Sequence, residues 1–207
     1  MVDPAGLVDA HAADALERAA AVLVSGGTVV LPTDTVYGLA ALPALPGATD
    51  ELFELKDRAA GQAIAVLVAD VEQALELVEE PSPEVRRWMD QLWPGQLTIV
   101  LQRSPAALHF ELGGEADTIG IRCPEHAFVR SLAAEVGPLA TTSANRSGEP
   151  TPAGAVAAAA SLTGPPDLVV DGGPAGTLAS TVVDASRETW RILREGAITA
   201  HQLHGLD

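Results

Sequence analysis

The chain has 207 residues, and its 12 basic and 28 acidic side chains give a formal net charge of −16 at pH 7. This balance argues against unaided binding of nucleic acid, because contact with phosphates needs a basic surface. A hydrophobic content of 47% argues against disorder, and a single cysteine, Cys123, excludes an internal disulfide framework.

In chain order, hydrophobic spacing predicts a helix at 9–24, a strand at 28–31, a helix at 49–56, a strand at 64–68, and helices at 71–78 and 83–92. Strands at 97–101 and 118–121, a helix at 128–136, a strand at 139–142, a helix at 153–161, and strands at 168–170, 181–183 and 190–193 follow. The last strands lie close together, which favours an α/β fold with a mixed sheet. We find no repeat or long linker, so residues 1–207 are predicted to form one domain.

No targeting segment is visible in the sequence. Residues 1–11 include acidic side chains and no basic one, unlike the start of a secretory signal peptide. The apolar run at 19–24 is too short to cross a bilayer. We therefore expect a cytoplasmic protein.

The basic residues are unevenly distributed between the two types. Eleven are arginine, and Lys56 is the only lysine. Arginine can replace lysine wherever a solvated positive charge is enough, but not where a compact ammonium must fit. Lys56 is therefore a candidate functional residue.

Polar residues gather at the ends of several apolar strands, where ligands of open α/β sheets bind. The clusters are 32–38, 56–58, 118–122 and 141–145. Their hydroxyl and amide groups can donate to phosphate or carboxylate oxygens, and their lysine and arginine supply positive charge. Together they indicate an anion site.

Each cluster alone also has an ordinary structural explanation. Thr33 and Thr35 could cap a helix or form a turn, and Arg122 could belong to a surface ion pair. The segment 145–148 is rich in turn-forming residues, and 56–58 could be a solvated helix end.

Several common catalytic motifs are missing from the sequence. It contains neither a phosphate-binding P-loop nor a Gly-x-Gly-x-x-Gly after a strand, and Ser143 lacks the Gly-x-Ser-x-Gly context of a nucleophile elbow. The single cysteine and five scattered histidines show no zinc-ligand spacing. Without an evident covalent nucleophile, catalysis would depend on positioning and charge stabilisation.

Eight segments in order resemble one known family. They are Pro-Thr-Asp-Thr-Val-Tyr-Gly-Leu at 32–39, Lys-x-Arg at 56–58, Trp-Pro-Gly-Gln-Leu-Thr at 93–98, Gly-Ile-Arg-Cys-Pro at 120–124, Ser-Ala-Asn-Arg-Ser-Gly at 143–148, Asp-Gly-Gly at 171–173, Ser-Thr-Val-Val-Asp at 180–184 and Arg-Glu-Gly at 194–196. This set resembles the YrdC-like L-threonylcarbamoyladenylate synthases, over about 26–196.

The resemblance implies a twisted mixed sheet, flanked by helices around a concave groove. It implies that L-threonine, bicarbonate and ATP give threonylcarbamoyl-AMP and pyrophosphate, with Mg²⁺ held mostly by the ATP phosphates and water. The product would serve threonylcarbamoyladenosine formation in tRNA. Separate transfer proteins would act on the tRNA, so direct tRNA binding by this acidic chain is not expected.

The resemblance also implies roles for individual residues. Threonine would be bound by Thr35, Arg122 and Thr141, with Tyr37 shaping the pocket wall. ATP would be contacted by Lys56, Arg58, Thr118, Ser143, Asn145, Thr151 and Arg194. Within this set, Lys56 and Arg58 would be catalytic, since they would offset charge on the triphosphate as pyrophosphate leaves.

The sequence departs from the family pattern beside Arg58. Ala59 and Ala63 stand where many members have proline, and Leu67 stands where some have a histidine. We expect a looser loop over the phosphates and the loss of one polar contact to threonine. We also expect this protein to be without the further C-terminal domain of the longer members.

Two alternatives remain open at the level of sequence. The first is the related carbamoyl-transfer module of hydrogenase maturation proteins, which lies in a longer chain with zinc-finger motifs that are not found here. The second is an RNA-binding module, against which the net charge and the lack of an aromatic and basic stripe both argue.

Overall fold

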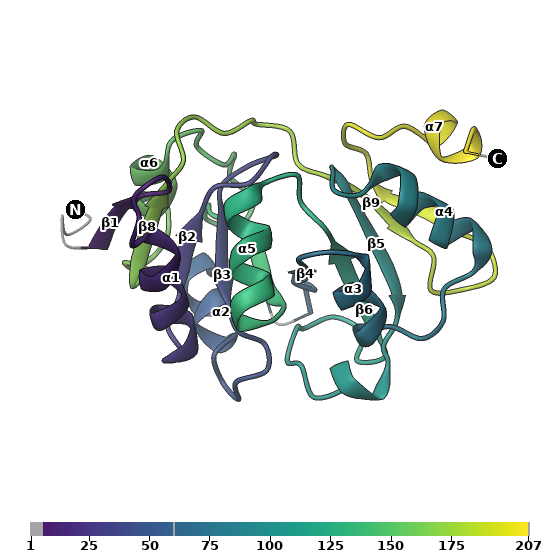
Figure 1. The fold of residues 1–207 in the computed structure, drawn as a ribbon, viewed down its shortest axis with the longest axis horizontal. Helices are drawn as coiled ribbons and strands as arrows, with labels where there is room; N and C mark the ends of the chain where they lie inside the picture. Colours follow the sequence, from purple (N-terminus) through teal and green to yellow (C-terminus); the bar gives the residue numbers. More distant parts are fainter. Residues whose placement is uncertain (1–5, 60, 207) are drawn as a thin grey trace.

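The computed structural model describes residues 6–59 and 61–206, and Figure 1 shows their arrangement. The strands are β1 (Leu7–Asp9), β2 (Val29–Leu31), β3 (Gly38–Ala41), β4 (Ala65–Leu67), β5 (Leu97–Gln102), β6 (Thr118–Arg122), β7 (Leu139–Ser143), β8 (Leu168–Asp171), β9 (Thr181–Asp184) and β10 (Arg191–Arg194). The helices are α1 (Ala15–Val24), α2 (Asp50–Lys56), α3 (Val71–Leu77), α4 (Pro83–Leu92), α5 (Ala127–Val136), α6 (Ala155–Ala160) and α7 (Ala200–His204), with a short 3-10 turn, η2 (Pro105–Ala107).

All these strands belong to one sheet, in the order β1-β8-β2-β3-β7-β4-β6-β5-β9-β10. Four neighbouring pairs are parallel, β1 with β8, β2 with β8, β4 with β6 and β5 with β9. The other pairs are antiparallel. The predicted α/β class and mixed sheet are therefore confirmed. The sheet spans the molecule, with β1 and α7 at opposite ends (Figure 1).

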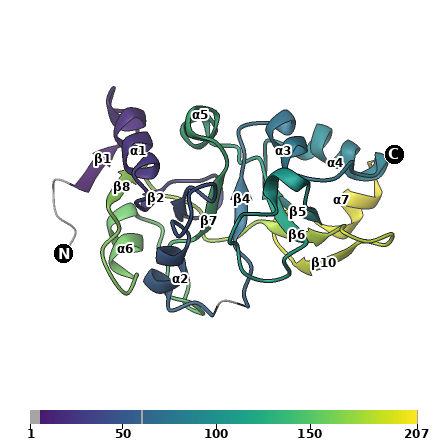
Figure 2. The same ribbon diagram turned by 90° about the horizontal axis from the view of Figure 1, so that it is seen from below.

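Helices cover the sheet from two sides. Figure 2 shows α1, α5, α3 and α4 along one side and α2 and α6 along the other. Apolar side chains of α1 and α5 pack with those of β2 and β8, whereas α3 and α4 pack with Leu97, Ile99 and Leu101 of β5. Because side chains alternate along a strand, Thr98 and Val100 point to the opposite face of β5. That face carries the site described below.

The sequence patterns missed two strands and one α-helix, as well as the short η2 turn. The strand β3 contains only Gly38, Leu39, Ala40 and Ala41, without the β-branched and aromatic residues that favour strands. It forms because it pairs on both edges, with β2 and with β7. Residues 7–9 form a strand beside β8, although they adjoin a predicted helix that actually begins at Ala15. The helix α7 is stabilised by a capping box between Thr199 and Gln202.

Among the described residues, no helix is both long enough and apolar enough to cross a membrane.

One glycine controls how the end of β10 approaches β9. A Cβ atom at Gly196 would lie 2.4 Å from the backbone nitrogen of Thr181 and 2.5 Å from the carbonyl oxygen of Ala179. Real Cβ atoms do not approach backbone so closely, so only glycine fits without a backbone shift. Gly196 therefore allows the chain after Arg194 to lie directly against the start of β9.

We expect Gly196→Ala to lower the free energy of unfolding by about 1–3 kcal/mol, because the new methyl group meets rigid backbone. Denaturant titration of both proteins measures the change. Gly154→Ala is the control, since a Cβ at Gly154 meets no atom within 4 Å, and it should cost less than about 1 kcal/mol. Equal losses in the two variants would contradict this account.

Candidate active site

A cavity of about 370 Å³ lies on the sheet face opposite α3 and α4. Side chains from β4, β5, β6, β7 and β9 form its floor, and the segments after β2 and before β9 form part of its wall. Its polar lining is mainly hydroxyl and guanidinium groups, from Thr33, Thr35, Arg58, Thr98, Arg103, Thr118, Arg122, Thr141, Thr142, Ser143, Ser180 and Arg194. Such a lining suits an anionic ligand.

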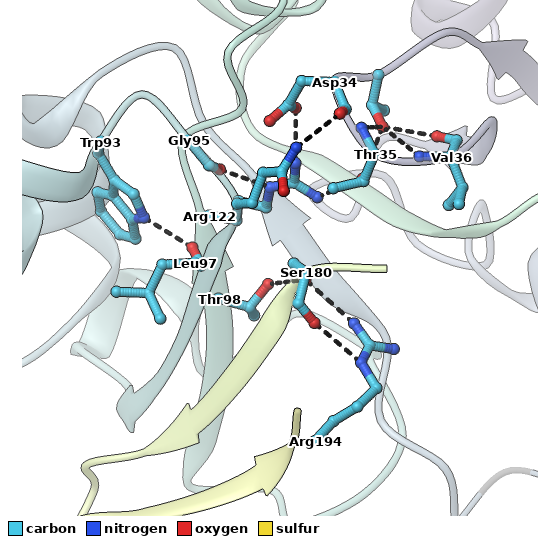
Figure 3. Close-up of polar contacts among 12 residues, drawn as sticks. Asp34, Thr35, Val36, Trp93, Gly95, Leu97, Thr98, Arg122, Ser180 and Arg194 are labelled. Carbon is cyan, nitrogen blue, oxygen red and sulfur yellow. Dashed lines mark hydrogen bonds and ion pairs between the residues drawn. The ribbon is translucent and has the colours of Figure 1, made fainter. Parts of the chain in front are cut away.

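Arg122, at the end of β6, has its guanidinium oriented by three contacts from two segments (Figure 3). Its Nε donates to the carbonyl oxygen of Gly95 at 2.9 Å, Nη1 donates to Thr35 Oγ1 at 2.8 Å, and Nη2 pairs with Asp34 Oδ1 at 2.6 Å. The Arg122 side chain is 6% exposed. Two of its five N–H groups have no partner in these bonds, and because Arg122 lines the cavity they can serve a ligand.

Arg194 and Ser180 form a second polar group on the cavity wall (Figure 3). Arg194 Nε donates to the Ser180 carbonyl oxygen at 3.0 Å, and its Nη2 donates to Ser180 Oγ at 3.1 Å. Ser180 Oγ also lies 2.8 Å from Thr98 Oγ1. The strand end of β10 is thereby joined to β5 through side chains that face the same cavity.

The third guanidinium, that of Arg58, comes from the segment after α2. Its Nε donates to the Gln62 carbonyl oxygen at 3.1 Å and its Nη2 to that of Ala63 at 2.7 Å. The Arg58 side chain is therefore hydrogen-bonded to backbone four and five residues further along the chain, where Ala63 lies. The predicted looseness of this loop stays a prediction. In the structure, Arg58 itself contacts the later part of the loop through these two hydrogen bonds.

Three of the four arginines that line the cavity, Arg58, Arg122 and Arg194, interact through their like charges. Burial lowers the pKa of Arg58, Arg122 and Arg194, and the charge of Arg194 lowers that of Arg58 further, as the charge of Arg122 does for Arg194. For Arg122 the neighbouring Asp34 carboxylate opposes the effect of burial on the pKa. Guanidinium groups stay protonated in proteins, so these shifts mean that a bound anion would relieve an unfavourable concentration of positive charge.

The cavity contains seven of the eleven residues predicted for the site. These are Thr35, Arg58, Thr118, Arg122, Thr141, Ser143 and Arg194. The other four, Tyr37, Lys56, Asn145 and Thr151, are not among the lining residues. The roles assigned to all eleven stay predictions.

Lys56 is buried behind the cavity wall, with only 1% of its surface exposed. Its ammonium donates to the carbonyl oxygen of Ser143, to the carbonyl oxygen of Asn145 at 2.8 Å and to Asn145 Oδ1 at 3.0 Å. Thr151 Oγ1 donates to the same Asn145 Oδ1 at 3.2 Å. Lys56 thus holds the turn after β7, and Ser143 is the member of this group that reaches the cavity.

Tyr37 is completely buried at the other side of the site. Its hydroxyl donates to the Gly173 carbonyl oxygen at 2.6 Å and accepts from the backbone N–H of Gly172 at 3.1 Å. Burial raises the pKa of Tyr37. The side chain therefore joins the start of β3 to the segment after β8.

Sequence reasoning did not assign several polar residues that the structure brings to the site. Thr33, Thr98 and Ser180 line the cavity, and Asp34 holds Arg122 from behind. All four lie in segments that the sequence had singled out, so their presence in those motifs was an available signal. Arg103, which also lines the cavity, lies in none of them, and its guanidinium donates to backbone carbonyl oxygens, including that of Phe110 at 2.7 Å.

Comparison with known proteins gives a family model, Sua5/YciO/YrdC, described as telomere recombination, that matches residues 21–196. The chain belongs to the Sua5/YciO/YrdC family. A relative from Bacillus subtilis, named threonylcarbamoyl-AMP synthase, is 37% identical over 194 residues, covering 92% of this chain and 56% of the relative. A relative from Mycobacterium leprae, named putative threonylcarbamoyl-AMP synthase, is 35% identical and covers 91% of this chain and 86% of the relative.

A solved structure of the family supports the same fold. Pyrococcus abyssi Sua5, crystallised with L-threonine, superimposes with a TM-score of 0.82 at 31% identity, covering 93% of this chain and 57% of that chain. This chain thus spans little more than half the length of the Bacillus and Pyrococcus proteins. The expected Sua5/YciO/YrdC fold, with a mixed sheet flanked by helices and a cavity on one face, is confirmed.

The Sua5/YciO/YrdC site here contains an apolar residue beside Arg122. Leu67 of β4 is the parallel-strand neighbour of Arg122, and both line the cavity. Among the described residues, no group of three or more His, Cys, Asp or Glu side chains is placed to hold a metal ion.

The buried ammonium of Lys56 predicts a pH dependence of stability. Burial, with a smaller effect of Arg58, lowers the pKa of Lys56 from 10.5 to about 8. Between these two values the unfolded chain binds more protons at this site than the folded chain, so the contribution of Lys56 to the free energy of unfolding rises with pH. Below about pH 8 this contribution is constant.

We expect the difference in unfolding free energy between the wild type and Lys56→Met to change in favour of the wild type between about pH 8 and pH 10.5. Denaturant titrations of both proteins across this range measure it. Because Lys56 is the only lysine in the chain, no other lysine contributes to the difference. A pH-independent difference would show that the ammonium is not held as described.

Proposed function

We propose that this chain is an L-threonylcarbamoyladenylate synthase, which converts L-threonine, bicarbonate and ATP into threonylcarbamoyl-AMP and pyrophosphate. The observation that carries the proposal is one cavity lined by several guanidinium groups, to which we assign two ligand regions. Arg122 with Thr35 forms one, and Arg58 with Arg194 contributes to the other. The names of the relatives in the Sua5/YciO/YrdC family support this activity.

The Arg122 region suits the amino acid. The two remaining N–H groups of Arg122 can bind the threonine carboxylate in a charge-assisted manner. Thr35 and Thr141 supply hydroxyls nearby, and both line the same cavity. Tyr37 then acts from behind, since its hydroxyl holds the adjoining segment rather than the cavity.

The Arg58 and Arg194 region suits the nucleotide. Both guanidiniums line the cavity together with Thr118 and Ser143, and each can donate to phosphate oxygens. Lys56, Asn145 and Thr151 then contribute by fixing the turn that carries Ser143. Lys56 would then support ATP binding by holding this turn, without touching the phosphates itself.

The reaction needs positioning and charge stabilisation rather than a side-chain nucleophile. The threonine ammonium first gives up a proton, and the neutral amine then bonds to the carbon of bicarbonate with loss of water and yields a carbamate. A carbamate oxygen then bonds to the α-phosphorus, while the bond from that phosphorus to the bridging oxygen breaks and pyrophosphate leaves. Arg58 and Arg194 would stabilise the negative charge that grows on the leaving group.

We further propose that Mg²⁺ accompanies ATP and is held mainly by phosphates and water, where it would offset phosphate charge. The residues at hand fit this arrangement, because the cavity lining supplies hydroxyl and guanidinium groups rather than a set of carboxylates. The product would pass to separate proteins that transfer it to tRNA, in the cytoplasm. The chain itself would not need to bind tRNA, in keeping with its net charge of −16.

The first test is pyrophosphate release by the purified chain. We expect release only when ATP, L-threonine and bicarbonate are all present, and mass spectrometry should detect threonylcarbamoyl-AMP. Reactions that lack one substrate at a time are the controls. Release that is unaffected by omitting threonine would contradict the proposal.

The second test assigns Arg122. We expect Arg122→Ala to weaken threonine binding by roughly 2 kcal/mol or more, because a charge-assisted carboxylate contact is lost in a buried site. ATP binding, measured separately by calorimetry, should change much less. Arg187→Ala is the matched control, since Arg187 lies in an exposed ion pair with Glu115. A larger loss for ATP than for threonine would mean that Arg122 serves the nucleotide.

A further inference from the structure

Asp34 supplies the only carboxylate within ion-pair distance of the cavity arginines Arg58, Arg122 and Arg194 in the part of the chain that the structure describes. Its Oδ1 lies 2.6 Å from Arg122 Nη2, and its side chain is 11% exposed. Asp34 does not itself line the cavity, whereas Arg122 does. The carboxylate therefore contacts the guanidinium, as Figure 3 shows, without itself being one of the groups that line the cavity.

The backbone of Asp34 is also held in place. Its carbonyl oxygen accepts a hydrogen bond from Gln96 Nε2 at 3.0 Å, and the next residue, Thr35, accepts from Arg122 Nη1. The neighbouring Gly95 accepts from Arg122 Nε. Three contacts from two segments thus determine where the guanidinium points, and Asp34 provides the charged one of the three.

We propose that Asp34 is a positioning residue that acts through Arg122, so that the two remaining N–H groups of the guanidinium face the carboxylate of the amino-acid substrate. This inference rests on the proposed function. It makes recognition directional, because Asp34 offsets the charge of Arg122 while its hydrogen bond fixes the orientation. Threonine recognition then depends on aimed N–H groups more than on net positive charge.

Charge and positioning predict opposite effects of removing the Asp34 carboxylate on threonine binding. Removing the Asp34 carboxylate makes the site more positive, so simple Coulomb attraction would strengthen the binding of a carboxylate. Loss of positioning would weaken it. Asp34→Asn tests this directly, because asparagine has nearly the same shape and keeps an oxygen for Arg122 while it removes the charge.

The experiment measures Kd for L-threonine and for ATP by calorimetry in the wild type, Asp34→Asn, Arg122→Ala and the double variant. We expect Asp34→Asn to raise the threonine Kd about tenfold or more with little change for ATP. In the Arg122→Ala background the same substitution should have almost no effect, because its route of action is gone. Threonine amide, which lacks the carboxylate, should distinguish poorly between the wild type and Asp34→Asn.

A matched control comes from a second acid–arginine pair. Asp184 is buried and accepts from Arg191 Nη2 at 3.1 Å, and neither residue lines the cavity. Asp184→Asn removes the charge of a buried carboxylate that is paired with an exposed arginine elsewhere in the sheet, so it should leave the threonine Kd unchanged even if stability falls. Denaturant titration of each variant reports folding separately.

Failure of the positioning role and failure of the proposed function give different results. Unchanged or tighter threonine binding in Asp34→Asn, or equal effects with and without Arg122, would overturn the positioning role while leaving the proposed function intact. A wild-type chain that binds no threonine would overturn the proposed function and, with it, this inference. A parallel loss for threonine and ATP would indicate a general structural role and would also overturn it.

Discussion

The buried guanidinium of Arg122 is the interaction on which the rest of the site depends. A charged group can be buried only when it is paired and hydrogen-bonded, and Arg122 meets this condition through Asp34, Thr35 and Gly95. Those partners come from the segments after β2 and before β5, which are far apart in the sequence. One side chain at the end of β6 therefore joins these two segments beside the cavity.

The charge of the whole chain and the charge of the cavity have opposite signs. The net charge is −16, yet Arg58, Arg122 and Arg194 face one cavity. The charge of Arg122 lowers the pKa of Arg194, and the charge of Arg194 lowers the pKa of Arg58. Coulomb interactions fall with distance and are screened beyond about 8 Å at physiological salt, so the local concentration of guanidinium groups governs binding inside the cavity. An overall acidic protein can thus bind strongly anionic small molecules while disfavouring extended contact with nucleic acid.

The site is built in two layers with different tasks. The inner layer, which includes Arg122, Arg194 and Ser143, lines the cavity. The outer layer contains Lys56 and Asp34, whose charged groups form hydrogen bonds with other protein atoms and do not line the cavity. Residues held from behind lose less freedom when a ligand binds, so the outer layer contributes by fixing geometry before the ligand arrives. Charged residues in the motifs of such a site therefore do not all touch the ligand.

The sequence by itself was enough to predict the α/β class, most strands and helices, and the segments that converge on the cavity, because hydrophobic period and turn residues are local signals. It could not predict β3, whose small residues form a strand only through pairing with β2 and β7. Nor could it distinguish Arg122, which faces the cavity, from Lys56, which faces carbonyl oxygens behind it. Local patterns specify which elements form, whereas the direction of a side chain depends on the partners that the twisted sheet brings beside it, and only the tertiary structure decides those.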